Sequence, residues 1–280
     1  MPFAPALPVT GLAGLRFLDR TKDQQVELFN KSPDVQREVD YFLENAGNFT
    51  TVDQLVTDRR ALAVVLGAFG LDDDIDKAAF VRKVIEEGTF DNRSFANRLV
   101  DPAYREMAAA LGFGDVGGLL VFENTRANIV AQYRERQFEL AVGEVDLDMR
   151  LVLNFKREIA DTASKNVNER TGWLLALGSP PMRQVVESAL GLPSQFALID
   201  IDQQVNEVID RASNLFGFKD VSAFQDPELI DKFVDRFMLQ QQVRNGSTAA
   251  TSSGSVALSL LSTSGLGSAA QSNLFASNLL

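Results

Sequence analysis

Apolar side chains recur along this chain at the spacing of an amphipathic helix. In one stretch the repeat is strict, with an apolar residue at every fourth position: Leu147, Leu151, Phe155 and Ile159. This spacing places such side chains on the face of a helix that is buried against a core. We find no series of strands with alternating apolar and polar residues. The pattern therefore predicts an all-α fold, built as a multi-helix domain.

Proline, glycine and capping residues indicate where the expected helices begin and end. Ser32-Pro33 and Asp101-Pro102 each combine a capping side chain with a proline at the first helical position. Gly70 and Gly112 follow apolar runs and are typical of helix ends. The expected helices span 21–30, 32–45, 52–69, 72–88, 101–112, 123–141, 145–167, 181–190, 199–216 and 227–242.

Composition divides the chain into three parts. Three prolines within the first eight residues favour an extended leader, which we assign to residues 1–20. Residues 21–243 form the expected helical domain, and residues 244–280 form a low-complexity tail. The first ten residues lack the basic start of a cleaved signal peptide. No segment reaches the roughly 18–20 apolar residues of a membrane-spanning helix, so we expect no membrane insertion.

The two halves of the helical domain, 21–118 and 119–243, share an order of short motifs. In both, a Leu-Gly helix end precedes a helix with an acidic start, then a Ser-Phe or Ser-Ala-Phe motif, then an Asp-Pro helix start. The Asp-Pro pairs are Asp101-Pro102 and Asp226-Pro227. A duplication would produce this order, but Leu-Gly and Asp-Pro are also common at helix ends and starts. The sequence leaves both explanations open.

The chain contains no cysteine and no histidine. This excludes disulfides, thiolate nucleophiles and thiolate metal sites, and removes the commonest general base. The absence has two alternative explanations: chance bias in composition, or export of the protein in an unfolded state. The carboxylate pairs Asp200 with Asp202 and Glu86 with Glu87 are too close in sequence to face one another on a helix. We therefore predict a protein without catalytic residues.

Acidic and glycine-rich stretches do not complete the motifs that they partly match. We interpret the acidic triplet 72–74 as a helix cap, because no calcium-loop glycine follows it. The segment 200–202 begins like a calcium loop, but Val205 and Arg211 occupy its glycine and glutamate positions. The glycines of 112–118 lack a following Gly-Lys-Ser/Thr and indicate a loop. We expect neither a metal site nor a cofactor.

The formal net charge of the chain is −11 and its pI is about 4.6. Such a surface repels the phosphate backbone of nucleic acids and anionic lipid headgroups. Basic residues are scattered rather than gathered in a stripe. The charge therefore argues against a nucleic-acid partner.

The composition changes abruptly after Arg244. Residues 245–280 contain no charged residue, and the Ser- and Gly-rich stretch 245–255 is typical of a flexible linker. The apolar residues beyond it suggest a segment that orders on a partner or a neighbouring subunit. The alternatives are a disordered tail and a segment that folds back on its own core. The candidate partner-binding residues are Leu258, Leu260, Leu261, Leu266, Leu274, Phe275, Leu279 and Leu280.

Several blocks resemble the alphaproteobacterial domain-of-unknown-function family 1217, whose members are often encoded in flagellar gene clusters. The blocks are 11–21, 32–42, 79–88, 94–99, 189–193 and 224–237, with sequences such as Ala-Phe-Val-Arg-Lys-Val-Ile-Glu-Glu-Gly at 79–88. The resemblance implies a helical, flagellum-associated protein with a structural or secretion-related role. It supplies no catalytic residues to transfer, and the tail lies beyond the matching blocks.

Three functions compete on these observations. The leading expectation is a non-enzymatic flagellar component or accessory protein, located in the flagellum or secreted by the flagellar export apparatus, that binds other flagellar or export proteins. The second is a cytoplasmic adaptor or export chaperone for a flagellar client. The third is an enzyme that works through carboxylates. The sequence leaves the oligomeric state open.

Overall fold

The computed structural model describes residues 3–165 and 167–250, and only the backbone of 246–250. Within these ranges every regular element is a helix, which confirms the predicted all-α fold. The α-helices are α1 Gly11–Asn30, α2 Pro33–Asn45, α3 Val52–Thr57, α4 Arg59–Phe69, α5 Ala78–Glu87, α6 Phe95–Arg98, α7 Pro102–Leu111, α8 Glu123–Gly143, α9 Leu147–Ser164, α10 Glu169–Gly178, α11 Pro180–Ala189, α12 Ile201–Phe216 and α13 Pro227–Ala250. The 3-10 helices are η1 Ala46–Asn48, η2 Asp72–Asp74, η3 Leu119–Val121, η4 Ser194–Leu198 and η5 Val221–Gln225.

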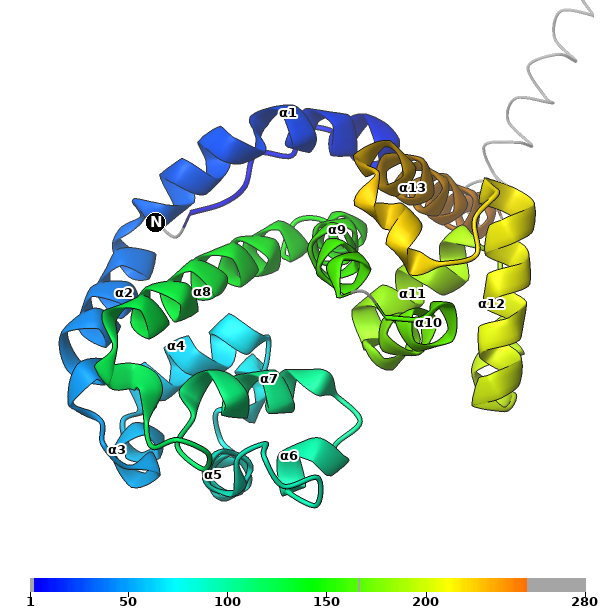
Figure 1. The fold of residues 1–280 in the computed structure, drawn as a ribbon. Coiled ribbons are helices and arrows are strands. Elements are labelled where there is room, and N and C mark those ends of the chain that lie inside the picture. Colours follow the sequence, from blue (N-terminus) through cyan, green and yellow to red (C-terminus); the bar gives the residue numbers. More distant parts are fainter. Residues whose placement is uncertain (1–2, 166, 251–280) are drawn as a thin grey trace, which may run out of the picture.

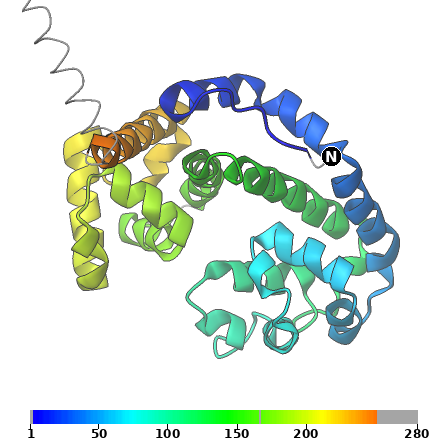
Figure 2. The ribbon, with the colours of Figure 1, turned by 180° about the vertical axis from the view of Figure 1, so that it is seen from behind.

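The helices form an open arc with two lobes (Figures 1 and 2). We call residues 33–111, from α2 to α7, the first lobe, and residues 147–250, from α9 to α13, the second lobe. Helix α8 runs between the lobes and contacts α4 on one side and α9 on the other. Helix α1 lies along the outer edge of the arc, where it contacts both α2 and α13. The concave side of the arc therefore lies between α7 and the α10–α11 pair.

The core of the first lobe is centred on α4, which packs closely against α8. Leu62, Val65 and Leu66 of α4 are fully buried or nearly so. At Gly67 an added Cβ would lie 2.9 Å from side-chain atoms of Tyr133, so glycine allows the close approach of the two helices. This contact fixes the position of α8 relative to the first lobe.

Aromatic rings fill the core of the second lobe. The rings of Phe155 and Phe233 are stacked with centroids 5.3 Å apart, and Phe224 meets Phe233 edge to face at 5.2 Å. Trp173 is fully buried and donates its indole N–H to the carbonyl oxygen of Lys219 at 2.6 Å. These contacts tie α9, α10, η5 and α13 together, and so hold the second wall of the concave side.

Many of the predicted helix limits agree with the structure. Helix α2 begins at Pro33 and ends at Asn45 as predicted, but the side chain of Ser32 makes no capping hydrogen bond. The Asp101 carboxylate accepts a hydrogen bond from the Ala103 N–H at 2.9 Å, as an N-cap does. Gly112 ends α7 in the left-handed conformation, with φ of 66°. Side-chain capping and glycine geometry thus account for the limits that the sequence predicts well.

The extended leader is shorter than predicted. Residues 3–8 and 10 have no regular structure, whereas helix α1 begins at Gly11 and includes half of the predicted leader. Leu15 and Leu18 of this helix are completely buried. The prolines restrict only the first eight residues, and apolar burial begins soon after them.

Two further predictions near the first lobe are wrong. The helix expected at 52–69 is divided at Asp58, whose carboxylate accepts a hydrogen bond from the Ala61 N–H and caps α4. The acidic triplet forms η2 and does not cap the following helix. Instead, the buried Asp74 accepts hydrogen bonds from the Tyr104 hydroxyl and the Lys77 ammonium. A local cap therefore divides the first helix, whereas a tertiary partner, Tyr104, holds Asp74.

The repeated motifs of the two halves form similar local structures. Leu71 N–H donates to the Leu66 carbonyl at 2.9 Å, and Leu192 N–H donates to the Glu187 carbonyl at 2.8 Å, so both Leu-Gly motifs close with the same six-residue turn. The packing differs, because α5 contacts α3 and α7 whereas α12 contacts α10. The duplication stays a prediction.

Candidate functional site: the cleft between the two lobes

A cleft of about 1020 Å³ opens on the concave side of the arc. Helices α8 and α9 line its floor, α7 forms one wall, and the α10–α11 turn forms the other. The walls carry small or apolar side chains, among them Ala103, Ala109 and Met182. Leu147, predicted to be buried, is 58% exposed and lines the rim of the cleft. Charged side chains cover the floor.

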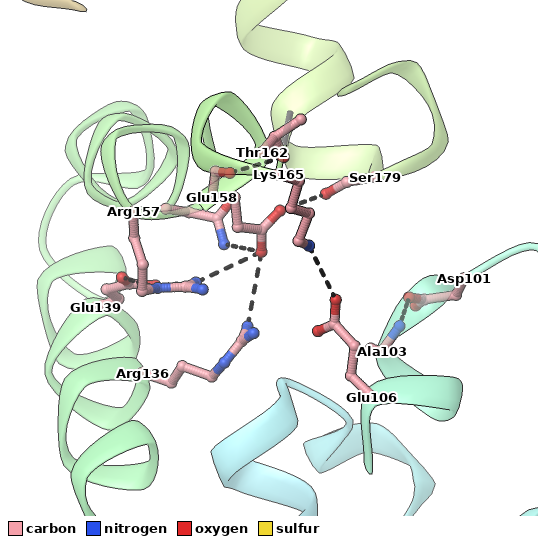
Figure 3. A network of polar contacts seen from close by, with 11 residues as sticks. Asp101, Ala103, Glu106, Arg136, Glu139, Arg157, Glu158, Thr162, Lys165 and Ser179 are labelled. Carbon is pink, nitrogen blue, oxygen red and sulfur yellow. Dashed lines mark hydrogen bonds and ion pairs between the residues drawn. The ribbon is translucent and has the colours of Figure 1, made fainter. Parts of the chain in front are cut away.

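Arg157 lies at the centre of the floor, between two glutamates (Figure 3). Its Nε and Nη2 atoms donate to the two carboxylate oxygens of Glu139 at 2.8 and 3.0 Å. Nη2 also lies 3.5 Å from Oε1 of Glu158. Burial acts to lower the pKa of Arg157, but the bidentate contact with Glu139 outweighs it and raises this pKa. The charge of Arg157 is therefore held in place and connects α8 to α9.

Both carboxylate oxygens of Glu158 are engaged. Oε1 accepts a hydrogen bond from Nδ2 of Asn154 at 3.0 Å and lies 3.8 Å from Nη1 of Arg136. Oε2 accepts a hydrogen bond from the Ser179 hydroxyl at 2.8 Å. Ser179 directly precedes α11, so Glu158 fixes the start of that helix relative to α9. The carboxylate is a structural junction and has no oxygen without a partner.

Arg136 reaches the floor from α8 and lies beside Gly70. A Cβ added to Gly70 would lie 2.8 Å from Nη1 of Arg136, so a larger residue would displace the guanidinium. Only 17% of the Arg136 side chain is exposed. Burial, and after it the neighbouring charge of Arg157, lower the pKa of Arg136 from its ordinary value. Its guanidinium makes no hydrogen bond to any residue that the structure describes.

One ion pair crosses the cleft. Nζ of Lys165, at the end of α9, lies 3.7 Å from Glu106 of α7 and 2.7 Å from Asp161 of its own helix (Figure 3). Both partners are about half exposed, so the pair adds little stability. It joins the α7 wall of the cleft to the end of α9 on its floor.

The residues that the sequence singled out lie elsewhere. The eight tail residues proposed to bind a partner lie outside the described residues. Asp200 caps α12, and Asp202 pairs with Arg170 on the surface. Glu87 accepts a hydrogen bond from the Phe95 N–H, and Glu86 is exposed. Among the described residues, no group of three or more acidic side chains is placed to hold a metal ion.

Sequence reasoning missed the cleft because its charged residues belong to different helices. Arg136 with Glu139 resembles an ordinary solvated pair on a helix surface, and the adjacent Arg157 and Glu158 are not expected to face one another on a helix. The available signal was the small hydrophobic contrast between the faces of α8, which has the charged residue Glu139 among its buried positions. Only the packing of α8 against α9 turns these charges toward one another.

Comparison with known proteins places this chain among relatives of the same fold. The family model described as "Protein of unknown function (DUF1217)" matches residues 68–230, which is more than half of the chain. The chain belongs to this family. The DUF1217 match includes every residue that lines the cleft, from Phe69 to Gln184.

A solved structure supports the assignment of the fold. The chain is similar to protein AGR_C_984 from Agrobacterium tumefaciens, with 28% sequence identity and a TM-score of 0.70. The similarity covers 87% of this chain and 100% of that protein. No curated protein matches the chain significantly. Within the described residues, none of the helices is both long and apolar enough to cross a membrane.

Proposed function

We propose that this DUF1217 protein is non-enzymatic and binds a partner polypeptide in the cleft between its lobes. The observation that carries the proposal is the cleft itself, at about 1020 Å³, with Ala109 and Met182 on its walls beside the charged Arg105 and Glu106, and with a charged floor. This volume lies at the upper end of the range of small-molecule pockets, which extends to about 1000 Å³. An extended segment of several residues fits such a space and touches both walls.

The chemistry of the floor favours binding over catalysis. A general base needs an oxygen that can reach a substrate proton. The oxygens of Glu158 and Glu139 are instead engaged by side chains of this protein, from Arg157, Arg136, Asn154 and Ser179. Such paired charges hold the floor rigid. They present a fixed surface to a partner.

A pair of matched variants tests binding in the cleft. Ala109 is exposed on α7 and lines the cleft, whereas Ala127 is exposed on α8 and does not line it. We expect Ala109→Arg to abolish copurification of the cellular partner, and Ala127→Arg to leave it unchanged. Both variants should show the far-ultraviolet circular dichroism of the parent chain. Retention of the partner by a folded Ala109→Arg protein would contradict the proposal.

The proposed setting is the bacterial flagellum, supported by the resemblance to a family often encoded in flagellar gene clusters. In this role the protein is a flagellar structural or accessory component and a substrate of the flagellar export apparatus. We expect deletion of the gene to impair motility. We also expect the protein in culture supernatant or basal-body fractions only when flagellar export works. A protein confined to the cytoplasm, in deletion cells that swim normally, would exclude this role.

The alternative is a cytoplasmic adaptor or export chaperone for a flagellar client. The cleft favours it as well, because a chaperone also holds an extended segment. The two roles differ in location and stoichiometry. A chaperone should bind one client in a fixed ratio and remain inside cells whose export apparatus is active, whereas an exported component should leave them.

A further inference from the structure

The segment from Phe3 to Pro8 runs back along α1, on the side of this helix that faces α8 (Figures 1 and 2). Helix α1 rises by about 27 Å between Gly11 and Phe29, at about 1.5 Å per residue. The chain from Phe3 to Gly11 spans at most about 26–29 Å. Because the ring of Phe3 contacts that of Phe29, the segment has to be extended, and it lies antiparallel to the helix.

Alternate residues of this segment pack against the rest of the molecule. The residues at positions 3, 5 and 7 are buried or partly buried, whereas those at positions 4, 6 and 8 are exposed. The Phe3 ring meets Phe29 of α1 edge to face at 5.5 Å, and its centroid lies 6.5 Å from that of Phe138 of α8. This alternation is that of an extended peptide bound to a surface, with every second side chain turned inward.

Gln25 of α1 binds the backbone of the segment. Its side-chain oxygen accepts a hydrogen bond from the Ala6 N–H at 2.8 Å, and its side-chain nitrogen donates to the Ala6 carbonyl oxygen at 3.2 Å. The same nitrogen donates to the hydroxyl of Thr21 at 2.8 Å, which fixes the amide in place. Backbone hydrogen bonds combined with contacts of alternate side chains are a general mode of peptide recognition. We call the surface formed by Gln25, Phe29 and Phe138 the docking surface.

Two glycines allow the chain to reverse direction between the segment and α1. Gly11 has φ of 67°, a conformation that favours glycine. A Cβ added to Gly14 would collide with the carbonyl oxygen of Val9, so glycine permits this close approach. Residues 8–10 are exposed, and residues 3–10 include no charged side chain. The segment is therefore joined to α1 by a short, exposed hinge, and no ion pair of its own side chains holds it down.

We propose that this segment also docks on a second copy of the chain, so that two copies exchange their N-terminal segments. Each copy carries both the segment and the surface that fits it. With the hinge straightened, the segment continues the direction of its own α1 and can lie antiparallel along α1 of the second copy. The same contacts form in both arrangements, so the hinge and the protein concentration set the balance between them.

The exchange is reciprocal and gives a two-fold symmetric dimer. The docking surface is separate from the cleft, since none of Gln25, Phe29 and Phe138 lines it. The exchange therefore leaves the cleft of each copy open to another partner.

Energy transfer between labelled full-length chains tests the exchange directly. The chain contains no cysteine, so introduced cysteines are labelled selectively. The donor dye is attached at Ala4→Cys, on the exposed side of the segment, and the acceptor at Leu28→Cys of a second population, beside Phe29 on α1. A control acceptor is attached at Phe90→Cys, which is exposed on the first lobe. We expect transfer to rise with protein concentration, and to be stronger to the acceptor at position 28 than to that at position 90.

Substitutions at the reversal of the chain shift the balance toward the dimer. Gly14→Ala and Gly11→Ala each disfavour the reversed hinge and leave the docking surface unchanged. We expect each to tighten dimerisation at least about tenfold in analytical ultracentrifugation, because every dimer relieves two reversed hinges. The matched control is Gly172→Ala in α10, whose Cβ would collide with Val221 within the second lobe, and which should not tighten dimerisation. Adding Phe3→Asp to Gly14→Ala should restore the monomer, because a carboxylate is costly between aromatic rings.

Four results would overturn the exchange. The first is absence of energy transfer at every concentration at which the chain stays soluble. The second is equal transfer to the two acceptor positions, which would show association through another surface. The third is equal tightening by Gly172→Ala and the hinge variants, which would show association caused by general destabilisation. The fourth is a dimer that survives Phe3→Asp. If Gly14→Ala does not fold, Gly11→Ala and the labelled chains with the original hinge decide the question.

Discussion

Arg157 joins the second lobe to α8 through a single side chain. Its guanidinium is bound to Glu139 on α8, whose side chain is only 8% exposed, and lies next to Glu158. Removing one partner of a buried pair leaves an uncompensated charge. We expect Arg157→Met to lower the free energy of unfolding by about 3 kcal/mol, measured by urea denaturation.

A double variant tests whether an uncompensated charge causes this loss of stability. The double variant Arg157→Met, Glu139→Met removes both charges, so we expect it to be more stable than Arg157→Met alone. Arg37→Met, at an exposed ion pair with Asp34, serves as a surface control and should have a smaller effect. Equal destabilisation by the single and double variants would mean that uncompensated charge is not the cause.

Asp115 makes the stability of the fold depend on pH. Its carboxylate accepts hydrogen bonds from the N–H and hydroxyl of Thr89, at 2.7 and 2.8 Å, and from the N–H of Phe90 at 2.9 Å. Burial acts to raise the pKa of Asp115, but these hydrogen bonds outweigh it and lower this pKa. The carboxylate therefore stabilises the fold in its charged form.

The sign of the pH effect follows from the lowered pKa. The stabilisation is complete above the unfolded pKa of Asp, about 3.9, and is lost as the pH falls toward the lower folded pKa. We expect Asp115→Asn to cost about 1 kcal/mol at pH 7, a low value because solvent screens a partly exposed group. The difference between parent and variant should shrink below about pH 4 in urea titrations. A difference that is constant from pH 7 to pH 3 would contradict this assignment.

At the scale of the elements, two glycines lie at helix ends, and we expect substitution by alanine to have opposite effects on stability at the two positions. Gly191, just after α11, has φ of 65°. Gly178, the last residue of α10, has no positive φ. At both positions an added Cβ would have no neighbouring atom within 4 Å. Steric crowding is thus equal, and only the backbone conformation differs. We expect Gly191→Ala to destabilise the protein by about 1 kcal/mol and Gly178→Ala to stabilise it by about 0.5 kcal/mol. Thermal unfolding measures both, and effects of the same sign would contradict the argument.

The helices were predictable where their ends are encoded locally. Ser32-Pro33, Asp101-Pro102 and Gly112 each fix a helix limit with their own side chain or backbone, and the structure confirms these limits. Prediction failed where a residue distant in sequence determines the position of a side chain. Asp74 is held by Tyr104, thirty positions away in sequence, and so leaves the helix that it was expected to cap.

The cleft could not be predicted from the sequence for the same reason. Its floor depends on the distance between α8 and α9 and on the start of α11. No local pattern encodes those positions. The apolar spacing that predicts α9 also fails at its first member, because Leu147 lies at the rim of the cleft where the second lobe turns away. Helical periodicity identifies a buried face, but it does not show where that face ends.

At the scale of the whole molecule, the arc depends on α1. Leu15 and Leu18 are completely buried, and α1 contacts both α2 and α13. The buried residues of the described core lie between residues 5 and 241. We expect deletion of residues 1–20 to lower the free energy of unfolding by at least about 4 kcal/mol, since two buried leucines are lost. Truncation after Val256 should leave the urea midpoint unchanged.

The same truncation decides between the two regions proposed to bind a partner. It removes the leucines from Leu258 to Leu280 and keeps the cleft. If the cleft carries the interaction, the truncated chain keeps the cellular partner and Ala109→Arg loses it. If the tail carries the interaction, the results are reversed, while both proteins remain folded by circular dichroism. Loss of the partner in both would mean that one partner contacts cleft and tail together, as linked sites on a single chain would allow.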